Sequence, residues 1–297
     1  MRWQNQEESQ NVDDRRGRSV SVGGGIGIGA IILALLALLL GGNPMAVLQQ
    51  ASQQAPTQTQ AGSSDGPYQP KTQEEAALTK VVKVTLKETE DVWNKLFREQ
   101  LGRTYQEPTM VLFSGRTVSA CGQAHSATGP FYCPGDEDIY IDLSFYQEMK
   151  NKFRAAGDFA MAYIVAHEVG HHVQHQLGLT TKIQQQKNRS SKAEANALSV
   201  RLELHADYLA GVWTHHMEKM SIEETGRGML EEGDIEEAIA SAASVGDDRI
   251  QKQSRGYVIP DSFTHGTSDQ RMRWFMKGLK SGRADNTDAY TIPYNQL

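Results

Sequence analysis

Apolar and polar positions divide the chain into an uncharged N-terminal stretch and a longer region with amphipathic periodicity. Residues 20–40 contain no charged side chain, and twenty-one residues at about 1.5 Å rise each can cross a ~30 Å hydrocarbon core as a helix. Arg15, Arg16 and Arg18 precede this stretch, and the next basic residue is Lys71. The positive-inside rule then places the N-terminus in the cytoplasm. We predict a single-pass anchor in the cell inner membrane, with the remainder of the chain periplasmic or extracellular.

Beyond the uncharged stretch, the periodicity predicts a mostly helical domain with a small sheet. Helical spacing of apolar residues occurs at about 74–99, 158–177, 191–216 and 268–279. Residues 108–143 instead contain two β-rich stretches, TMVLF and DIYIDL, with Gly and Pro between them. The predicted fold class is therefore α+β, preceded by one transmembrane helix.

Composition sets the expected domain boundaries. Residues 1–19 are polar and charged, which suits a cytoplasmic tail before the anchor at 20–40. Residues 41–73 are rich in Gln, Ala, Ser, Thr, Gly and Pro, and they contain too little apolar surface to fold, so we interpret them as a flexible linker. The folded domain is expected to cover residues 74–297.

Charge, glycine spacing and cysteine content bear on partners and compartment. The formal net charge is -6 and no long basic run occurs, so we expect no nucleic-acid partner. Gly25 and Gly29 form a G-x-x-x-G pattern in the anchor, which permits a homodimer through the transmembrane helix. If the domain is exported, Cys121 and Cys133 are expected to form a disulfide that closes the loop between them.

A metal-binding pattern, H-E-x-x-H, lies in the helix predicted at 158–177 as His167, Glu168 and His171. Histidines four residues apart lie on one helix face, so both can reach one zinc ion. Glu168 stands beside them, where it can take a proton from a metal-activated water. Apolar residues flank the motif, whereas a chance pair on a solvated helix would lack such flanks.

The third ligand has to come from elsewhere, because a catalytic zinc usually has three protein ligands and one open position. Glu203 and Asp207 are four residues apart beside the apolar stripe of the next predicted helix. We predict that Glu203 binds the metal. Asp207 is expected to accept the N–H of a ligand histidine, His167 rather than His171. Glu194 is the nearest rival for the third position, but its neighbours are polar.

Four segments give the chain a clear resemblance to a known family. They are GPFYCPGDEDIYIDLSFY, AHEVGHHVQ, SVRLELHADYLAGVW and FTHGTSDQRMRWF, within roughly residues 70–285. HEVGH followed by an E-x-x-x-D helix is similar to the gluzincin class of zinc peptidases. More closely, the chain resembles the bacterial putative neutral zinc metallopeptidase family. The resemblance implies a zincin-like catalytic domain with an N-terminal anchor, and it implies no particular substrate.

Two further features bear on how a substrate would be handled. Peptide hydrolysis needs a donor for the developing oxyanion besides the metal. His265, in a loop ahead of a predicted helix, is our first choice and Tyr208 a weaker one, while a loop-capping role for His265 stays open. DIYIDL is interpreted as an edge strand that would pair with an extended substrate, with an interior strand as the alternative.

Together these patterns favour a membrane-anchored zinc peptidase that acts on a peptide or protein substrate. His167, His171 and Glu203 would hold Zn²⁺, with Glu168 and His265 as catalytic groups. The alternative is a membrane-tethered, non-catalytic peptide-binding or regulatory module with a structural zinc. Glu168 favours the enzyme, because a structural site closes its fourth position with a protein ligand and has no use for an acid between its histidines.

Overall fold

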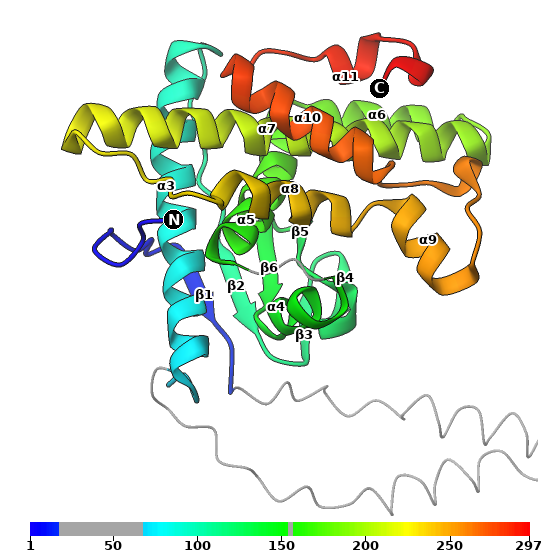
Figure 1. Ribbon diagram of the computed structural model, residues 1–297. Helices are drawn as coiled ribbons and strands as arrows, with labels where there is room; N and C mark the ends of the chain where they lie inside the picture. The colour runs from blue at the N-terminus through cyan, green and yellow to red at the C-terminus, as the bar shows by residue number, and fades with distance from the viewer. Residues whose placement is uncertain (18–67, 154–156) are drawn as a thin grey trace, which may run out of the picture. The chain divides into compact units, whose positions relative to one another are not determined.

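The computed structural model describes residues 1–17, 68–153 and 157–297 (Figure 1). Met1–Arg16 and Gln69–Leu297 form one compact unit, which contains every element discussed below. The other unit, Gly17–Tyr68, lies almost wholly outside the described residues. The stretches predicted as the anchor and as most of the linker fall in that unit.

Helices make up most of the first unit, and the four long ones occur where the sequence predicts them, although the helix predicted at 191–216 continues past residue 216. They are α3 (Gln73–Glu99), α5 (Asp158–Gln176), α7 (Lys192–Thr225) and α10 (Ser268–Ser281). The shorter helices are α4 (Ser144–Glu148), α6 (Leu179–Lys187), α8 (Asp234–Ser244), α9 (Asp247–Arg255) and α11 (Asp288–Thr291). A π-helical turn covers Met149–Phe153, and 3₁₀ turns cover Ser126–Thr128, Pro260–Ser262 and Tyr294–Gln296. The expectation of a mostly helical α+β fold is confirmed.

The helix boundaries follow from local capping chemistry. The side chain of Thr72 accepts a hydrogen bond from the backbone N–H of Glu75 and so begins α3. Ser191 and Glu194 form a reciprocal capping box at the start of α7. That helix ends where Gly226 adopts a left-handed conformation at φ 74°, which costs glycine little.

The strands form one mixed sheet and one hairpin. In the four-stranded sheet the order is β1 (Val12–Asp14), β2 (Met110–Phe113), β6 (Asp138–Asp142) and β5 (Phe131–Cys133). The first three strands are parallel and β5 is antiparallel to β6. The hairpin consists of β3 (Arg116–Ser119) and β4 (Gly122–His125).

The position of β6 corrects one expectation. DIYIDL was expected at a sheet edge, but β6 lies between β2 and β5, and the edge on this side is β5. The alternation in DIYIDL indicates which face each residue takes and carries no information on what pairs beside it. Ile139, Tyr140 and Ile141 are all buried, as suits a strand that is covered on both faces and paired on both sides.

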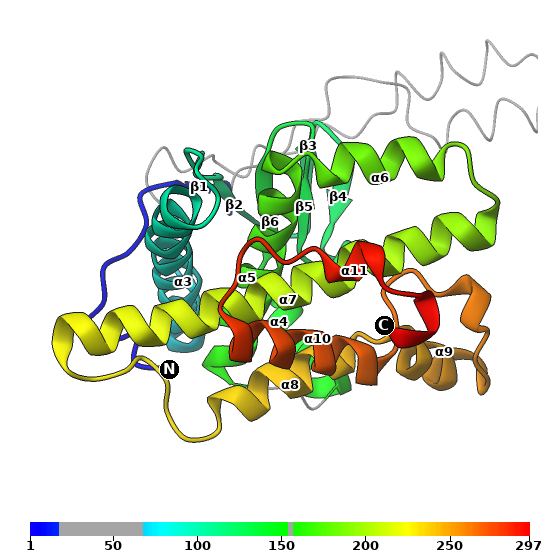
Figure 2. The same cartoon turned by 90° about the horizontal axis from the view of Figure 1, so that it is seen from above.

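Helix α5 lies at the centre of the first unit, and α7 crosses it closely (Figures 1 and 2). The close approach depends on Gly170, where an added Cβ would lie 3.0 Å from the carbonyl oxygen of Ala206. On its other side α7 packs along α10, and a Cβ at Gly278 would lie 1.9 Å from the carbonyl oxygen of Tyr208. Side chains at these two positions would push the helices apart, so the glycines set the helix spacing around α7.

The first residues of the chain belong to the folded domain, whereas a separate tail was expected. Val12–Asp14 pairs with β2, and Met1 is only 1% exposed. The α-ammonium of Met1 lies 2.9 Å from Asp158 and 3.0 Å from Asp234, at the starts of α5 and α8. These two acids and Glu237 lie close enough together to hold a cation, and the ammonium already supplies that charge.

The expectation of a transmembrane helix is not upheld and is withdrawn. Among the residues that the structure describes, no helix is long and apolar enough to cross a membrane. The predicted anchor, 20–40, lies outside them. Strand β1 precedes that stretch, yet it pairs with β2, which follows it. A single crossing would separate these two strands by a ~30 Å hydrocarbon core, so a single-pass inner-membrane location with the domain outside is contradicted as well.

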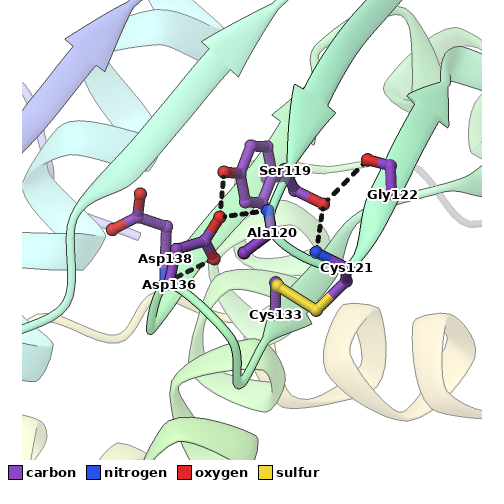
Figure 3. The surroundings of a disulfide bond; sticks show 8 residues. Ser119, Ala120, Cys121, Gly122, Cys133, Asp136 and Asp138 are labelled. Carbon is purple, nitrogen blue, oxygen red and sulfur yellow. Dashed lines mark hydrogen bonds between the residues drawn. A yellow bond between two sulfur atoms is a disulfide. The ribbon is translucent and has the colours of Figure 1, made fainter.

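A disulfide joins the hairpin to the edge strand, as expected from the two cysteines (Figure 3). Cys121 lies in the turn between β3 and β4, and Cys133 ends β5. Beside the disulfide, the carboxylate of Asp136 accepts hydrogen bonds from the backbone N–H of Ala120 at 2.8 Å and from the hydroxyl of Tyr140 at 2.7 Å. The hairpin is therefore tied to the sheet by both a covalent bond and a polar contact.

Candidate metal centre

Helices α5 and α7 bring His167, His171 and Glu203 together where they cross. One ligand atom from each of the three residues lies within 4.8 Å of the others. Nε2 of His167 is 3.3 Å from one carboxylate oxygen of Glu203, and Nε2 of His171 is 3.5 Å from the other. The two histidines share a helix face, and α7 supplies the carboxylate from across the gap.

The separations between these atoms fit a tetrahedral zinc ion. Ligand atoms that each lie about 2.0–2.1 Å from such an ion are roughly 3.3 Å apart. The two nitrogen–oxygen distances, one to each oxygen of the Glu203 carboxylate, are close to this value. Two imidazole nitrogens and one carboxylate are also a donor set found in catalytic zinc sites, where the fourth position stays open. The residues therefore fit the metal on both geometry and chemistry.

Asp207 holds the first histidine in the orientation a ligand needs. Its Oδ1 is 2.8 Å from Nδ1 of His167, so Nδ1 donates its hydrogen to Asp207 and Nε2 is the nitrogen directed toward Glu203, where it would bind a metal. This is the contact that the spacing of Glu203 and Asp207 predicts. Asp207 is completely buried, and a buried carboxylate needs several partners to remain charged.

Those partners are Arg271 from α10 and Tyr163 from α5. Arg271 donates to Asp207 through Nε at 2.8 Å and through Nη2 at 2.9 Å, and the Tyr163 hydroxyl donates to it as well. Arg271 itself is only 3% exposed. Sequence reasoning assigned no role to either residue. A signal was present for the arginine, because Arg271, Trp274, Phe275 and Gly278 follow the i, i+3, i+4, i+7 spacing of a buried helix face.

The second histidine is oriented by an amide. Nδ1 of His171 lies 3.0 Å from Oε1 of Gln174, and Gln174 donates in turn to the carbonyl of Leu202 at 2.7 Å. The same amide nitrogen lies 3.2 Å from Nδ1 of His205. Burial lowers the pKa of His205 to about 4, which keeps this imidazole neutral. Sequence reasoning left Gln174 without a role.

The electrostatics of the centre favour a cation. Burial alone raises the pKa of Glu203, but the adjacent His171 and His167 outweigh it and hold that pKa far below its usual range. For Asp207, burial acts in the same direction, and Arg271 and His167 lower the pKa overall. Burial lowers the pKa of His167, yet Asp207 and Glu203 raise it to about 9. Two ionised carboxylates thus face the histidines.

The centre opens into a cavity of about 500 Å³. Glu168 lines it together with the three candidate ligands, and its side chain is mostly buried. A cavity of this size suits a segment of an extended ligand. An acid that lies next to a metal ligand and faces such a cavity is placed to exchange a proton with a bound molecule.

His265 lines the same cavity from the loop ahead of α10. The carboxylate of Asp247 accepts the backbone N–H groups of Thr264, His265 and Gly266, at 2.7, 2.6 and 3.1 Å. The Asp247 hydrogen bond to its side chain raises the pKa of His265 despite partial burial. Both the cleft-facing position and the loop-binding contact expected for this histidine are therefore present.

The remaining candidates lie away from the centre. The Tyr208 hydroxyl bonds to Ser281 and to the carbonyl of Arg283, and Tyr208 is not among the residues that line the cavity. Glu194 is exposed in the capping box of α7. Two other histidines near the centre, His175 and His205, are not in the ligand group: His175 lies 3.8 Å from Glu137, and His205 contacts the amide of Gln174. Tyr208 is thus ruled out as the oxyanion donor, and Glu194 as the third ligand.

Comparisons with known proteins agree with the character of this site. The sequence model of the family described as "putative neutral zinc metallopeptidase" matches residues 1–290. The chain is 47% identical over 289 residues to the uncharacterized protein YpfJ of Escherichia coli strain K12, which covers 95% of this chain and 96% of that one. It is 43% identical over 191 residues to the uncharacterized protein Rv2575 of Mycobacterium tuberculosis strain H37Rv, covering 63% and 64%. No solved structure gives a significant match.

Proposed function

The chain belongs to the putative neutral zinc metallopeptidase family, and we propose from this that it is a zinc-dependent peptidase that hydrolyses peptide bonds with an activated water. One observation carries the proposal. Two histidine nitrogens and a Glu203 carboxylate oxygen converge within 4.8 Å of one another, and their residues line an open cavity together with Glu168. The carboxylate of Glu203 is paired with the two histidines, whereas Glu168 adds a carboxylate that metal binding does not require.

In this proposal His167, His171 and Glu203 hold the zinc ion. When bound, zinc supplies a Lewis acid that polarises a peptide carbonyl and makes a water molecule more acidic. Glu168 takes the proton of the attacking water and passes it to the leaving amine. Asp207 keeps the His167 ring in the tautomer that leaves Nε2 free for the metal.

His265 is proposed to donate a hydrogen bond to the oxyanion that develops on the substrate. It lines the cavity, and its side chain is 49% exposed, so it can reach a bound peptide. Its contact with Asp247 favours the protonated imidazolium, which is a donor at both nitrogens. Asp247 also fixes the backbone around His265, so little conformational freedom is lost when the imidazole donates to the oxyanion.

The substrate backbone is proposed to bind at strand β5. This strand is the edge of the sheet nearest the cavity, and Phe131 and Tyr132 of β5 line the cavity. An extended peptide can add to such an edge through main-chain hydrogen bonds, which give affinity without strong sequence preference. The partner implied is a peptide or an unfolded segment of a protein.

The test compares zinc content and hydrolysis in single variants of the full chain. Glu168→Gln should keep one zinc per chain and lose hydrolysis, because an amide of the same shape cannot accept the proton. His171→Ala should lose both. Glu232→Gln is the matched control, since Glu232 is exposed and does not line the cavity. Zinc is measured by elemental analysis, and hydrolysis by mass spectrometry of a peptide mixture.

Three results would contradict the proposal. The first is a wild-type chain that is purified without chelators and contains no zinc. The second is a Glu168→Gln variant that hydrolyses peptides as fast as the wild type. If zinc is present but the wild type cleaves nothing, the metal is structural and the peptidase function fails.

A further inference from the structure

We propose that the cavity beside the metal centre takes a bulky apolar side chain of the substrate, and that Phe145 and Ile250 help to set this preference. The inference rests on the proposed peptidase function and names its substrate class. It starts from two groups of apolar side chains that line the cavity together with the candidate ligands.

One group comes from β5 and α4 and is rigid. Phe131 stacks on the buried Tyr140, with ring centroids 4.9 Å apart and planes 6° apart. The Tyr132 hydroxyl lies 3.1 Å from Nδ1 of His172 on α5. Phe145 packs over Gly129, where an added Cβ would meet its ring at 3.5 Å. These rings are already in place, so a substrate side chain would not have to order them.

The other group comes from the end of α8 and from α9. Val245 and Ile250 line the cavity, and Ile250 is 39% exposed. The start of α9 is fixed to the loop that contains His265, because Asp247 accepts three backbone N–H groups of that loop. Asp248 accepts from the backbone N–H and hydroxyl of Ser268. The helix that carries the exposed isoleucine is therefore fixed to the loop of the proposed oxyanion donor, and both residues line the cavity.

Each charged side chain among the described residues of the cavity wall is either paired with another protein residue or assigned to the metal site or to catalysis. Arg271 is bound to Asp207 and His265 to Asp247. The others are Glu168 and the three candidate ligands. A charged substrate side chain that enters here would lose water and gain no counter-ion from these groups, whereas an apolar one gains contact area.

The expected size of the preference follows from burial. Fully burying a Leu, Ile, Val, Met or Phe side chain favours binding by an amount equivalent to a factor of about 10–100. We therefore expect peptides with such a side chain next to the cleaved bond to be cut about 10–100 times faster than the same peptides with Asp, Glu or Lys there.

A charge placed on the wall tests which residues set the preference. Ile250→Asp should reduce cleavage next to apolar side chains about tenfold or more and raise cleavage next to Lys and Arg, because the new carboxylate supplies the missing counter-ion. Ile222→Asp is the matched control: Ile222 is 49% exposed on α7 and does not line this cavity. The control should keep the wild-type pattern. Equal preferences in the Ile250→Asp and Ile222→Asp chains would overturn the assignment of Ile250.

A binding measurement separates this inference from the proposed function. Zinc-loaded Glu168→Gln should bind a fluorescent peptide with a central Leu or Phe about 10–100 times more tightly than its Asp counterpart, measured by anisotropy. If the wild type cleaves peptides without an apolar preference, the substrate class is wrong and the peptidase function stands. If nothing is cleaved but this binding difference is found, the apolar cavity stands and the peptidase function fails. Equal binding of the two peptides overturns the inference.

Discussion

At the scale of single residues, the candidate centre depends on how buried polar groups satisfy one another. Asp207 accepts hydrogen bonds from His167, Tyr163 and Arg271, and all four side chains are buried. Removing one member leaves the others in a low-dielectric interior without a partner, which costs more than the lost contact itself. Metal affinity and local stability are therefore coupled at this carboxylate.

We predict that Asp207→Asn weakens zinc binding about 10–100-fold. The amide keeps the shape of the carboxylate but cannot hold His167 in the required tautomer as strongly, and it leaves the buried Arg271 without its counter-ion. Zinc affinity is measured by competition with a chelator of known strength. Asp269→Asn provides the control, because Asp269 lies at an exposed position of α10 and pairs with Arg273. Unchanged zinc affinity in the Asp207→Asn variant would refute the role of this residue.

Among the elements, β5 forms one part of the cleft wall and is only three residues long. Strand β5 pairs with β6 on one side, and its last residue is bonded to Cys121 of the hairpin turn. Tyr132 contacts His172 on α5. A short edge strand has few hydrogen bonds of its own, so the disulfide and these side-chain contacts keep it in place.

We predict that reduction of the Cys121–Cys133 disulfide lowers the free energy of unfolding by about 2–3 kcal/mol, the amount expected for a loop of this length. Urea denaturation with and without a phosphine reductant measures the difference. A chain with both cysteines replaced by alanine should not respond to the reductant. If the wild type is equally stable in both conditions, the disulfide does not support the wall.

At the scale of the whole domain, the N-terminal residues close the fold. The Met1 ammonium bonds to Asp158 at the start of α5 and to Asp234 at the start of α8. Glu237 accepts the backbone N–H of Phe159 nearby. The helix that carries the H-E-x-x-H motif is therefore held at its first turn by contacts with the first residue of the sequence.

This arrangement predicts a loss of stability at high pH. Burial lowers the pKa of the Met1 ammonium, but the hydrogen bonds to Asp158 and Asp234 raise it overall above its usual 8.0. A group whose pKa is raised by folding stabilises the protein below its unfolded pKa, and that contribution is lost as the pH rises through the folded pKa. Stability should therefore fall above pH ~8. Acylation of the amine should remove this dependence and lower stability at pH 7, as urea unfolding between pH 7 and 10 would reveal.

The local features of this protein could be predicted from short stretches of sequence. His167 and His171 are four residues apart, as are Glu203 and Asp207, and on a helix this spacing places both side chains of a pair on the same face. The four long helices followed from apolar periodicity, which is also a short-range property. The prediction of the disulfide depended on an assumed compartment, but the sequence contains only two cysteines, so only one pairing was possible.

Contacts between residues far apart in the sequence could be seen only in the folded chain. The pairing of Asp207 with Arg271, the exposed edge at β5 in place of β6, and the position of Met1 within the domain each join parts of the chain that no local pattern connects. The uncharged stretch at 20–40 shows the limit of predicting location from composition. Its composition suggested an anchor, but the pairing of β1 with β2 excludes a single crossing between these two strands. A hydrophobic composition indicates that a segment can be buried, but it does not indicate in which environment.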